Sequence, residues 1–397
     1  AGPVSGWIHS SPSPKTVAAD GARAVQAAMA APGQVATLIL PADTAWLDAD
    51  GPAEALPITG PSAVSQSAID IAAIALKSGK KTAIMLRGLS LRKRGLIAAG
   101  RIAAKTGARI MCDTFAPRVE RGAGLVMVER IPYFAEQIVE TFQDVEGLIL
   151  VGTKPPVSFF AYPGKASWCT PEGAEIHYLA QAHEDGVAAL EALADALGAP
   201  AEPAHIAPLK LPDLPSGKLD QFTVGAVIAH FLPEGAIISD ESATSRLGSE
   251  TATITAAPHD HLSLTGGAIG QGLPVATGAA VACPDRKVVC LHGDGGAMYT
   301  LQSLWTMARE SLDVTVIVFA NRGYQILRNE LTNVGVESYG RNAQAMFDVE
   351  KPDLDWVSLA RGHGVPATRI DDMAGFVTAL TAGLNSDGPS LIEVVCP

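Results

Sequence analysis

The chain has 397 residues, of which 48% are hydrophobic and 18% charged, and its formal net charge is −12 at pH 7. This length and composition fit two or three domains with apolar cores and argue against long disordered tails. The acidic balance argues against a general nucleic-acid-binding role, because binding to phosphate backbones needs a basic surface.

The cysteines and the apolar runs argue against several further classes of protein. The five cysteines are an odd number and form no CxxC pair, so neither a zinc site nor a disulfide framework is expected, and a reduced, cytoplasmic setting is the default. No apolar run reaches membrane-spanning length. The first residues, AGPVSGW, contain neither Met nor a signal-peptide pattern, so we expect the chain to begin inside a longer protein.

Residues 1–61 contain one predicted helix, Val17–Ala31, and one buried strand, Val35–Leu40, followed by a Pro- and Gly-rich linker at 51–61. A second block, 62–200, alternates helices with strands and fades into a Pro-rich stretch after Gly198. Its predicted elements are helix Val64–Lys77, strand Thr82–Leu86, helix Leu96–Thr106, strand Ala108–Met111, helix Tyr133–Thr141 and strand Leu148–Val151. This alternation predicts a parallel sheet covered by helices on both faces.

The third block, 216–397, has the same rhythm and is also predicted to be a doubly wound α/β unit. Its predicted elements are helix Phe222–Phe231, strand Ala236–Ser239, strand Val288–Leu291, helix Ala297–Arg309, strand Val314–Phe319, helix Leu354–Arg361, helix Met373–Leu384 and strand Ser390–Val395.

The most informative motif is Gly293-Asp294-Gly295, which follows the hydrophobic strand at 288–291 and precedes a helix. Asp294 is therefore predicted to lie at the carboxyl end of a parallel strand, where doubly wound folds bind their ligands. Glycines let main-chain amides approach a ligand, and a helix N-terminus favours phosphate.

A second hydrophobic strand, at 314–319, leads to Asn321, which lies 27 positions after Asp294. A right-handed βαβ crossover would place both residues at the same edge of neighbouring strands. Carboxylate, amide and carbonyl oxygens, the last from Gly323, suit Mg²⁺. The alternative is an ordinary Rossmann-like turn in which Asp294 caps a helix and Asn321 is a loop residue. The pairing of two strand ends favours the metal site.

This pair of motifs resembles the thiamine diphosphate motif of 2-oxo acid decarboxylases and acetolactate synthase large subunits. The resemblance implies that Mg²⁺ binds Asp294, Asn321 and the Gly323 carbonyl and bridges to the diphosphate of the cofactor. The further cofactor contacts that it implies in these motifs are Gly293, Gly295, Gly296, Ala297, Asn321, Gly323 and Tyr324. Relatives often carry a Ser at the position of Gly296, so the chain departs from the pattern there.

Two further segments resemble cofactor-binding parts of the same family. In the Gly-rich segment 265–274, the resemblance implies that the Gly267 carbonyl accepts from the aminopyrimidine and that Ile269 is the apolar wedge that bends the cofactor. The alternative for this segment is a Gly-rich helix-packing region. In the segment 239–244, Ser242, Ala243 and Thr244 would contact the diphosphate. The alternative is a helix N-cap, and the two roles are compatible.

The resemblance covers the chain unevenly. Residues 216–397 resemble the diphosphate-binding domain, 62–200 a Rossmann-like central domain, and 1–50 only the C-terminal tail of a pyrimidine-binding domain. In the family, a Glu of the pyrimidine domain activates the cofactor. We assign this Glu to no residue here, so the catalytic residue is unknown, and we expect the segment that holds it to precede residue 1 or to come from a separate subunit.

Three other features of the sequence bear on the function. The segment Ser158–Gly164 is similar to benzoylformate decarboxylase-like proteins but lacks the His that such decarboxylases use near the substrate. His292 is predicted to be structural. The family's synthases can bind FAD in the central domain, near 91–95 in this chain, but no residue supports FAD here.

The resemblance therefore predicts a thiamine diphosphate- and Mg²⁺-dependent enzyme that decarboxylates and ligates 2-oxo acids in the manner of acetolactate synthase, as a lyase or transferase. One alternative is a benzoylformate decarboxylase-like enzyme. Another, of a different class, is a non-catalytic binding or regulatory partner with the same fold. A homodimer or homotetramer acting on a small 2-oxo acid is expected, without nucleic acid or membrane partners.

Overall fold

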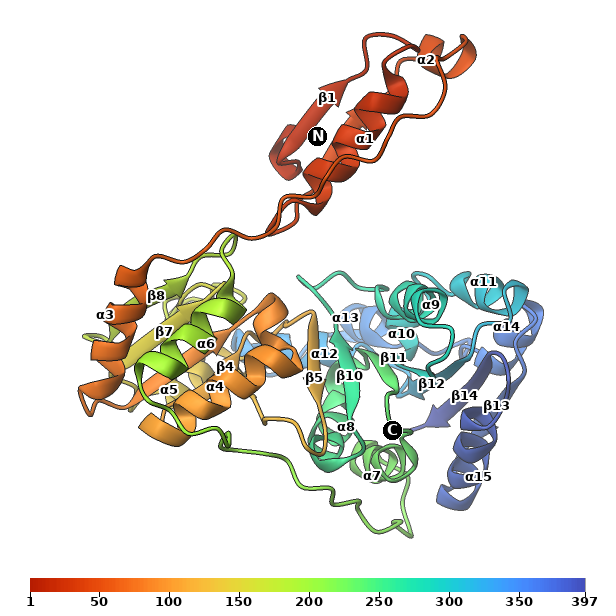
Figure 1. Cartoon of the computed structure of the whole chain (residues 1–397). Helices are drawn as coiled ribbons and strands as arrows, with labels where there is room; N and C mark the ends of the chain where they lie inside the picture. Colours follow the sequence, from red (N-terminus) through yellow and green to blue (C-terminus); the bar gives the residue numbers. More distant parts are fainter. Residues whose placement is uncertain (397) are drawn as a thin grey trace.

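The computed structural model describes residues 1–396, which form three parallel α/β units joined in chain order (Figure 1). The first unit pairs two short strands in parallel and packs one helix against them. Its elements are β1 (Trp7–Ser10), α1 (Val17–Met29), β2 (Ala36–Ile39) and α2 (Ala42–Trp46). Residues 47–61 contain no helix or strand and connect this unit to the next.

The central unit is a five-stranded parallel sheet in the order β6-β4-β3-β7-β8. Helices α3, α4 and α6 bury their apolar faces on one side of it, and α5 covers the other. The elements are α3 (Gln66–Lys77), β3 (Thr82–Leu86), α4 (Lys93–Thr106), β4 (Arg109–Cys112), β6 (Glu129–Arg130), α5 (Ala135–Phe142), β7 (Gly147–Val151), β8 (Glu175–Ala180) and α6 (Gly186–Ala196).

The C-terminal unit is a seven-stranded sheet in the order β13-β14-β12-β11-β9-β10-β5. Helices α7 and α15 pack on one face, and α9, α11 and α14 on the other. Its strands are β9 (Ile237–Glu241), β10 (His259–Ser263), β11 (Val288–Gly293), β12 (Val314–Ala320), β13 (Ala367–Ile370) and β14 (Ser390–Val395). Its helices are α7 (Gln221–Phe231), α8 (Arg246–Ala252), α9 (Gly272–Ala282), α10 (Asp294–Ala297), α11 (Ser303–Arg309), α12 (Gln325–Asn333), α13 (Arg341–Phe347), α14 (Trp356–Gly362) and α15 (Met373–Leu384).

One strand crosses from the central unit into the sheet of the C-terminal unit. Strand β5 (Arg118–Arg121) follows β4 in sequence but pairs antiparallel with β10. The Arg118 guanidinium fixes this junction, because its Nε and Nη2 lie 2.5 and 3.0 Å from the two carboxylate oxygens of Asp260. The two units therefore share hydrogen bonds as well as side-chain contacts.

Several predicted helices differ from the structure by one to three residues at an end, and one is not a single helix. The expected helix Ala297–Arg309 is divided into α10, which already begins at Asp294, and α11, which begins at Ser303. Turns fill the gap, and the Thr300 hydroxyl donates to the carbonyl of Gly270 at 2.6 Å. This side-chain bond ties the turn to the Gly-rich segment. No helix within residues 1–396 is both long and apolar enough to cross a bilayer.

Candidate functional site

Asp294 and Asn321 lie at the ends of adjacent parallel strands. Gly293, the last residue of β11, pairs in register with Phe319 of β12, so the two chain segments leave the sheet side by side. Asp294 is only 4% exposed. Its Oδ2 accepts from the amide of Arg322 at 2.8 Å, and its Oδ1 accepts from the amide of Gly295 at 2.8 Å. The structure thus brings together the two residues that the sequence singled out.

The loop after β12 presents further oxygen atoms. The side-chain Oδ1 of Asn321 accepts from the amide of Gly323 at 3.2 Å. Arg322 has a φ of 57°, in the left-handed region, which turns the chain sharply at this point. Within the described residues, the Gly323 carbonyl accepts no hydrogen bond. A carboxylate, an amide oxygen and a carbonyl are hard ligands of the kind that Mg²⁺ prefers.

The electrostatics of Asp294 are those of a buried carboxyl group with no cationic side chain bonded to it. Burial raises the pKa of Asp294, and the main-chain amides of Arg322 and Gly295 offset only part of that rise. A divalent cation at this carboxylate would favour its ionised form. The residues present at the strand ends therefore fit a metal–diphosphate group.

The Gly-rich segment 265–272 reaches the same end of the sheet. Gly266, Gly267 and Gly270 have φ values of 59°, 70° and 92°, which side chains rarely adopt. Ile269 is 52% exposed, although its side chain is fully apolar. The Gly267 carbonyl accepts from the amide of Ile269 at 2.9 Å and retains a second lone pair for another donor.

Glu241 holds this segment in place, a role that the sequence analysis missed. Its buried carboxylate accepts from the amide of Gly270 at 2.5 Å and from that of Gly272 at 2.6 Å. Its Oε2 also lies 3.2 Å from Nε2 of His292, which is completely buried. The Nδ1 of His292 lies 3.1 Å from the carbonyl of Gly293. One carboxylate therefore connects the ends of β9 and β11 with the Gly-rich segment.

The segment after β9 differs in detail from the expectation. Ser242 is buried, and its hydroxyl donates to Oδ1 of Asp240 at 2.6 Å, so this hydroxyl is already committed within the chain. Ala243 is exposed and Thr244 half-buried. Residues 243–245 form a single 3₁₀ turn, and Ser242 makes no side-chain cap to it. Thr244 is therefore the accessible hydroxyl of the pair.

The remaining predicted contacts surround Asp294. Gly295 and Ala297 are buried, whereas Gly293 and Gly296 are half-buried. The Tyr324 ring packs on Gly295 so closely that a methyl group there would lie 2.4 Å from Cε1 of the ring. A side chain at Gly296 would meet the ring of His292 at 3.1 Å, so the Ser that relatives often carry has little room here.

A loop of the central unit covers the Gly-rich segment with aromatic rings. The Phe159 ring lies so close to Gly267 that an added methyl group would be 3.3 Å from its Cζ. The rings of Phe115 and Phe160 lie 4.8 and 4.7 Å from that of Phe159. The Tyr162 hydroxyl donates to Glu330 of α12. This contact ties the loop to the helix that follows the Asn321 loop.

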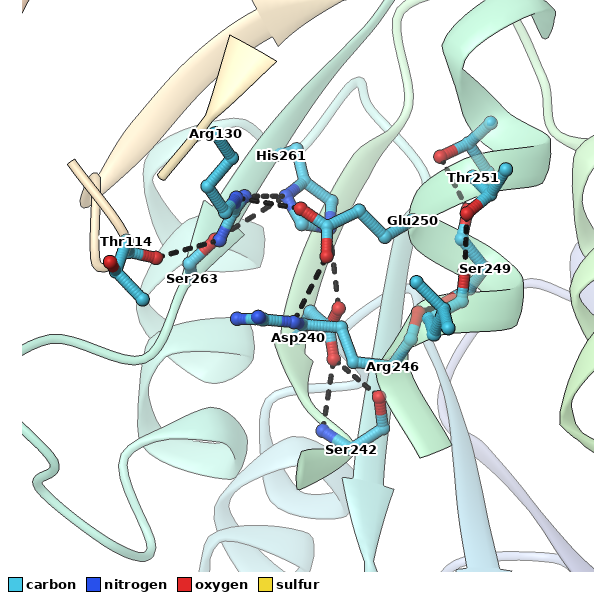
Figure 2. Close-up of polar contacts among 12 residues, drawn as sticks. Thr114, Arg130, Asp240, Ser242, Arg246, Ser249, Glu250, Thr251, His261 and Ser263 are labelled. Atoms are coloured by element: carbon cyan, nitrogen blue, oxygen red, sulfur yellow. Dashed lines mark hydrogen bonds and ion pairs between the residues drawn. The ribbon is translucent and has the colours of Figure 1, made fainter. Parts of the chain in front are cut away.

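A buried polar network extends from the site toward the central unit (Figure 2). Asp240, whose Oδ1 accepts from Ser242, has its Oδ2 3.4 Å from Nε2 of His261. Burial alone would raise the pKa of Asp240, but the His261 and Ser242 contacts outweigh it and lower the pKa to about 2. Arg130 donates to Ser263 at 3.0 Å beside His261. This network connects the end of β9 with β6.

The sequence is similar to those of thiamine diphosphate-dependent enzymes. A family model described as the thiamine pyrophosphate enzyme, C-terminal TPP binding domain, matches residues 245–394. The chain is 45% identical over 401 residues to the putative acetolactate synthase large subunit IlvX of Mycobacterium tuberculosis. The matched region covers 100% of this chain and 76% of that protein. It is 32% identical over 186 residues to the benzoylformate decarboxylase of Pseudomonas aeruginosa, covering 45% of this chain and 32% of that protein.

Solved structures share the fold. The thiamine diphosphate-dependent 4-hydroxybenzoylformate decarboxylase of Rhodococcus jostii superposes with a TM-score of 0.81 at 23% identity, over 99% of this chain and 76% of that chain. A benzoylformate decarboxylase from Polynucleobacter necessarius gives a TM-score of 0.78 at 20% identity, over 99% of this chain and 76% of that chain. At these identities the likeness establishes the α/β architecture of the three units.

Proposed function

We propose a function for this chain on one premise: it belongs to the family of thiamine diphosphate-dependent enzymes that includes the acetolactate synthase large subunits. The proposal is that the chain binds thiamine diphosphate through Mg²⁺ and acts on 2-oxo acids by decarboxylation and carboligation, as an acetolactate synthase-like enzyme. The observation that carries the proposal is the meeting of Asp294 with the Asn321–Gly323 loop, through the hydrogen bond from the Arg322 amide to the Asp294 carboxylate.

The residues of the site divide into a metal-holding and a cofactor-supporting group. Asp294, Asn321 and the Gly323 carbonyl would hold Mg²⁺, which normally completes its coordination with waters and phosphate oxygens. The Gly296 amide and the Thr244 hydroxyl would face the diphosphate, and Gly295, whose amide donates to Asp294, would lie beside it. Ile269 would give the rings of the cofactor an apolar support, and the Gly267 carbonyl would accept from the aminopyrimidine. Bound thiamine diphosphate supplies the electron sink that allows a 2-oxo acid to lose CO₂.

The catalytic glutamate of the family stays unassigned. Glu241 does not fit that role, because both of its carboxylate oxygens already accept from main-chain amides within the Gly-rich segment. The complete active site is expected to include a pyrimidine-binding partner surface in a homodimer or homotetramer. Light scattering of the purified protein would measure that assembly.

Calorimetry of the full-length protein with thiamine diphosphate tests the proposal. We expect tight binding in the presence of Mg²⁺, loss of binding with a chelator, and release of CO₂ from pyruvate. Metal-dependent binding with no turnover of any 2-oxo acid would instead support the alternative of a non-catalytic partner. Absence of metal-dependent binding would contradict both.

A second candidate, a benzoylformate decarboxylase-like enzyme, is favoured by one specific observation. Phe159 lies against Gly267, and the side chains of Phe159, Phe160 and Ile269 are 40%, 49% and 52% exposed. Large apolar surfaces that are grouped and exposed usually mark a binding site. This aromatic wall is suited to a 2-oxo acid with an aryl side chain. Comparing CO₂ release from phenylglyoxylate and from pyruvate distinguishes the two candidates.

A further inference from the structure

A cavity of about 1010 Å³ lies where the central unit meets α8 of the C-terminal unit, and none of the residues assigned to the cofactor lines it. The central unit contributes β4, the chain from Val119 to Phe134 and the start and end of α5. The other wall comes from α8 and the 3₁₀ turn Thr253–Thr255 that follows it. A cavity of this size is in the range of small-molecule sites.

The charges around the cavity are mostly positive, although the whole chain carries a net charge of −12. Four arginines and two glutamates line it: Arg109, Arg121, Arg130, Arg246, Glu129 and Glu250. Arg109 is paired with Glu129 through two hydrogen bonds, of 3.2 and 2.5 Å, so these two charges cancel. Three guanidinium groups therefore remain around the single carboxylate of Glu250.

Glu250 forms ion pairs with two arginines, one through each carboxylate oxygen (Figure 2). Arg130 Nε lies 2.6 Å from its Oε1, and Arg246 Nε lies 3.0 Å from its Oε2. Both terminal nitrogens of Arg246 are without a hydrogen-bond partner among residues 1–396. Each carboxylate oxygen thus already binds one arginine, and Arg246 retains donors beside the cavity.

Arg121 is the third arginine and has no carboxylate partner. Its Nη2 donates to the main-chain carbonyl of Glu250 at 2.5 Å, and it forms no ion pair with any residue of the described chain. Burial lowers the pKa of Arg121 to about 10, so the guanidinium remains charged at neutral pH. The Glu250 carboxylate partly offsets this effect on the pKa of Arg121, but Glu250 also binds Arg130 and Arg246. The three guanidinium groups therefore carry an excess of positive charge, which an anion beside them would offset. A guanidinium fork matches carboxylate and phosphate oxygens.

Apolar side chains form a large part of the remaining lining, beside the polar Gln137, Thr141, His205 and Thr251. Ile110, Val119, Val126 and Ile131 are buried side chains in this wall, whereas Leu247 is 56% exposed at its edge. A bare inorganic ion would leave these surfaces without a partner. The lining is therefore suited to a molecule that joins an anionic group to an apolar body.

We propose that this cavity is a second ligand site, separate from the proposed thiamine diphosphate site, which binds a small organic anion through Arg121 and Arg246. The anionic group is a carboxylate or a phosphate, and the apolar body packs against Val119, Val126 and Leu247. The site does not depend on the proposed enzymatic function, since it shares no residue with the cofactor site.

Calorimetry of the full chain with three matched probes tests this site: phenyl phosphate, phenylacetate and the uncharged benzyl alcohol. Excess thiamine diphosphate and MgCl₂ keep the phosphate probe out of the cofactor site. We expect at least one anion to bind and benzyl alcohol not to bind. The tighter of the two anions identifies phosphate or carboxylate as the natural group. Failure of both anions to bind, or equal binding of benzyl alcohol, would overturn the proposal.

Two variants locate the binding within the cavity. We expect Arg121→Gln to weaken binding of the anion by about tenfold or more, as the loss of a charged hydrogen bond does. The control Arg94→Gln removes the same charge from an exposed ion pair with Glu191, outside the cavity, and should change affinity less than twofold. Leu247→Trp fills the cavity from its exposed edge and should abolish binding even if Arg121→Gln does not fold. Unchanged affinity in Leu247→Trp would show that the anion binds elsewhere.

Discussion

The carboxylate of Glu241 lies 3.2 Å from the imidazole of His292, and both side chains are buried beneath the Gly-rich segment 265–272. The same carboxylate accepts from the amides of Gly270 and Gly272. The Gly-rich segment is therefore held by a residue that lies 29 and 31 positions before the two amides it binds. We regard Glu241 as a positioning residue for the proposed cofactor site.

Replacing Glu241 by Gln should loosen this segment without removing a proposed ligand. The amide NH₂ would face a main-chain N–H, so one of the two hydrogen bonds is lost, which costs about 1–3 kcal/mol for buried groups. We expect roughly tenfold weaker thiamine diphosphate binding and faster hydrogen exchange at Gly270 and Gly272. The exposed Glu234→Gln is the control. Wild-type exchange rates in Glu241→Gln would contradict the positioning role.

Phe159 should set the choice of substrate in the second candidate function. Its ring is 40% exposed and contacts Gly267. We expect Phe159→Ala to lower kcat/KM for phenylglyoxylate about tenfold relative to pyruvate, because an aromatic contact and its buried area are lost. Trp168→Ala, an exposed aromatic outside this ring cluster, serves as the control. An unchanged preference would contradict the benzoylformate decarboxylase-like candidate.

The stability of the protein should fall in mild acid because of His259. This side chain is 3% exposed, and burial lowers its pKa to about 3. The folded state therefore keeps it neutral, while the unfolded chain takes up a proton below its ordinary pKa of about 6.5. Stability from this group is present at neutral pH and declines as the pH falls from about 6.5 toward 3.

Urea unfolding at two pH values measures this effect. Between pH 7 and pH 5 the titration of His259 alone should reduce the free energy of unfolding by about 2 kcal/mol. His259→Gln does not titrate, so the difference between the two pH values should be smaller by that amount. An identical pH dependence in the variant and the wild type would show that other groups dominate.

The junction between the central and C-terminal units should depend on Asp260. Its carboxylate, 7% exposed, binds Arg118 of β5 and also lies 2.8 Å from Nη2 of Arg286. Asp260→Asn leaves two guanidinium groups without their counter-charge, and we expect a loss of about 2–4 kcal/mol in unfolding free energy. The control Asp144→Asn breaks the exposed pair with Lys81 and should cost less than about 1 kcal/mol.

Sequence reasoning located the elements whose pattern is local. Strand β3, helix α15 and strand β14 have the bounds that were predicted, because each is an uninterrupted apolar or amphipathic run between polar or Gly-containing turns. The Asp294 and Asn321 positions also followed from local patterns, since each directly ends a hydrophobic strand. Parallel pairing then brings the two together.

The features that were missed depend on partners far away in sequence. Strand β10 contains two histidines and an aspartate, and it is buried only because Arg118, Asp240 and Arg286 lie around it. Helix α9 is a run of mostly small residues that begins at Gly272, within the Gly-rich segment, so its start carried no clear signal. Glu241 acts by accepting hydrogen bonds from main-chain amides, and no pattern of side chains in the sequence predicts such bonds. The only hint in the sequence was that two acidic residues, Asp240 and Glu241, end the hydrophobic strand β9.

The most direct test of the proposed cofactor site is the Mg²⁺-dependent binding of thiamine diphosphate to Asp294→Asn. The substitution keeps the shape of the side chain but removes the charge that would hold the cation, and the exposed Asp285→Asn is its matched control. We predict that the affinity for thiamine diphosphate in the presence of Mg²⁺ falls roughly 100-fold in Asp294→Asn and stays within twofold in the control. Wild-type affinity with an unchanged Mg²⁺ dependence in Asp294→Asn would contradict the account.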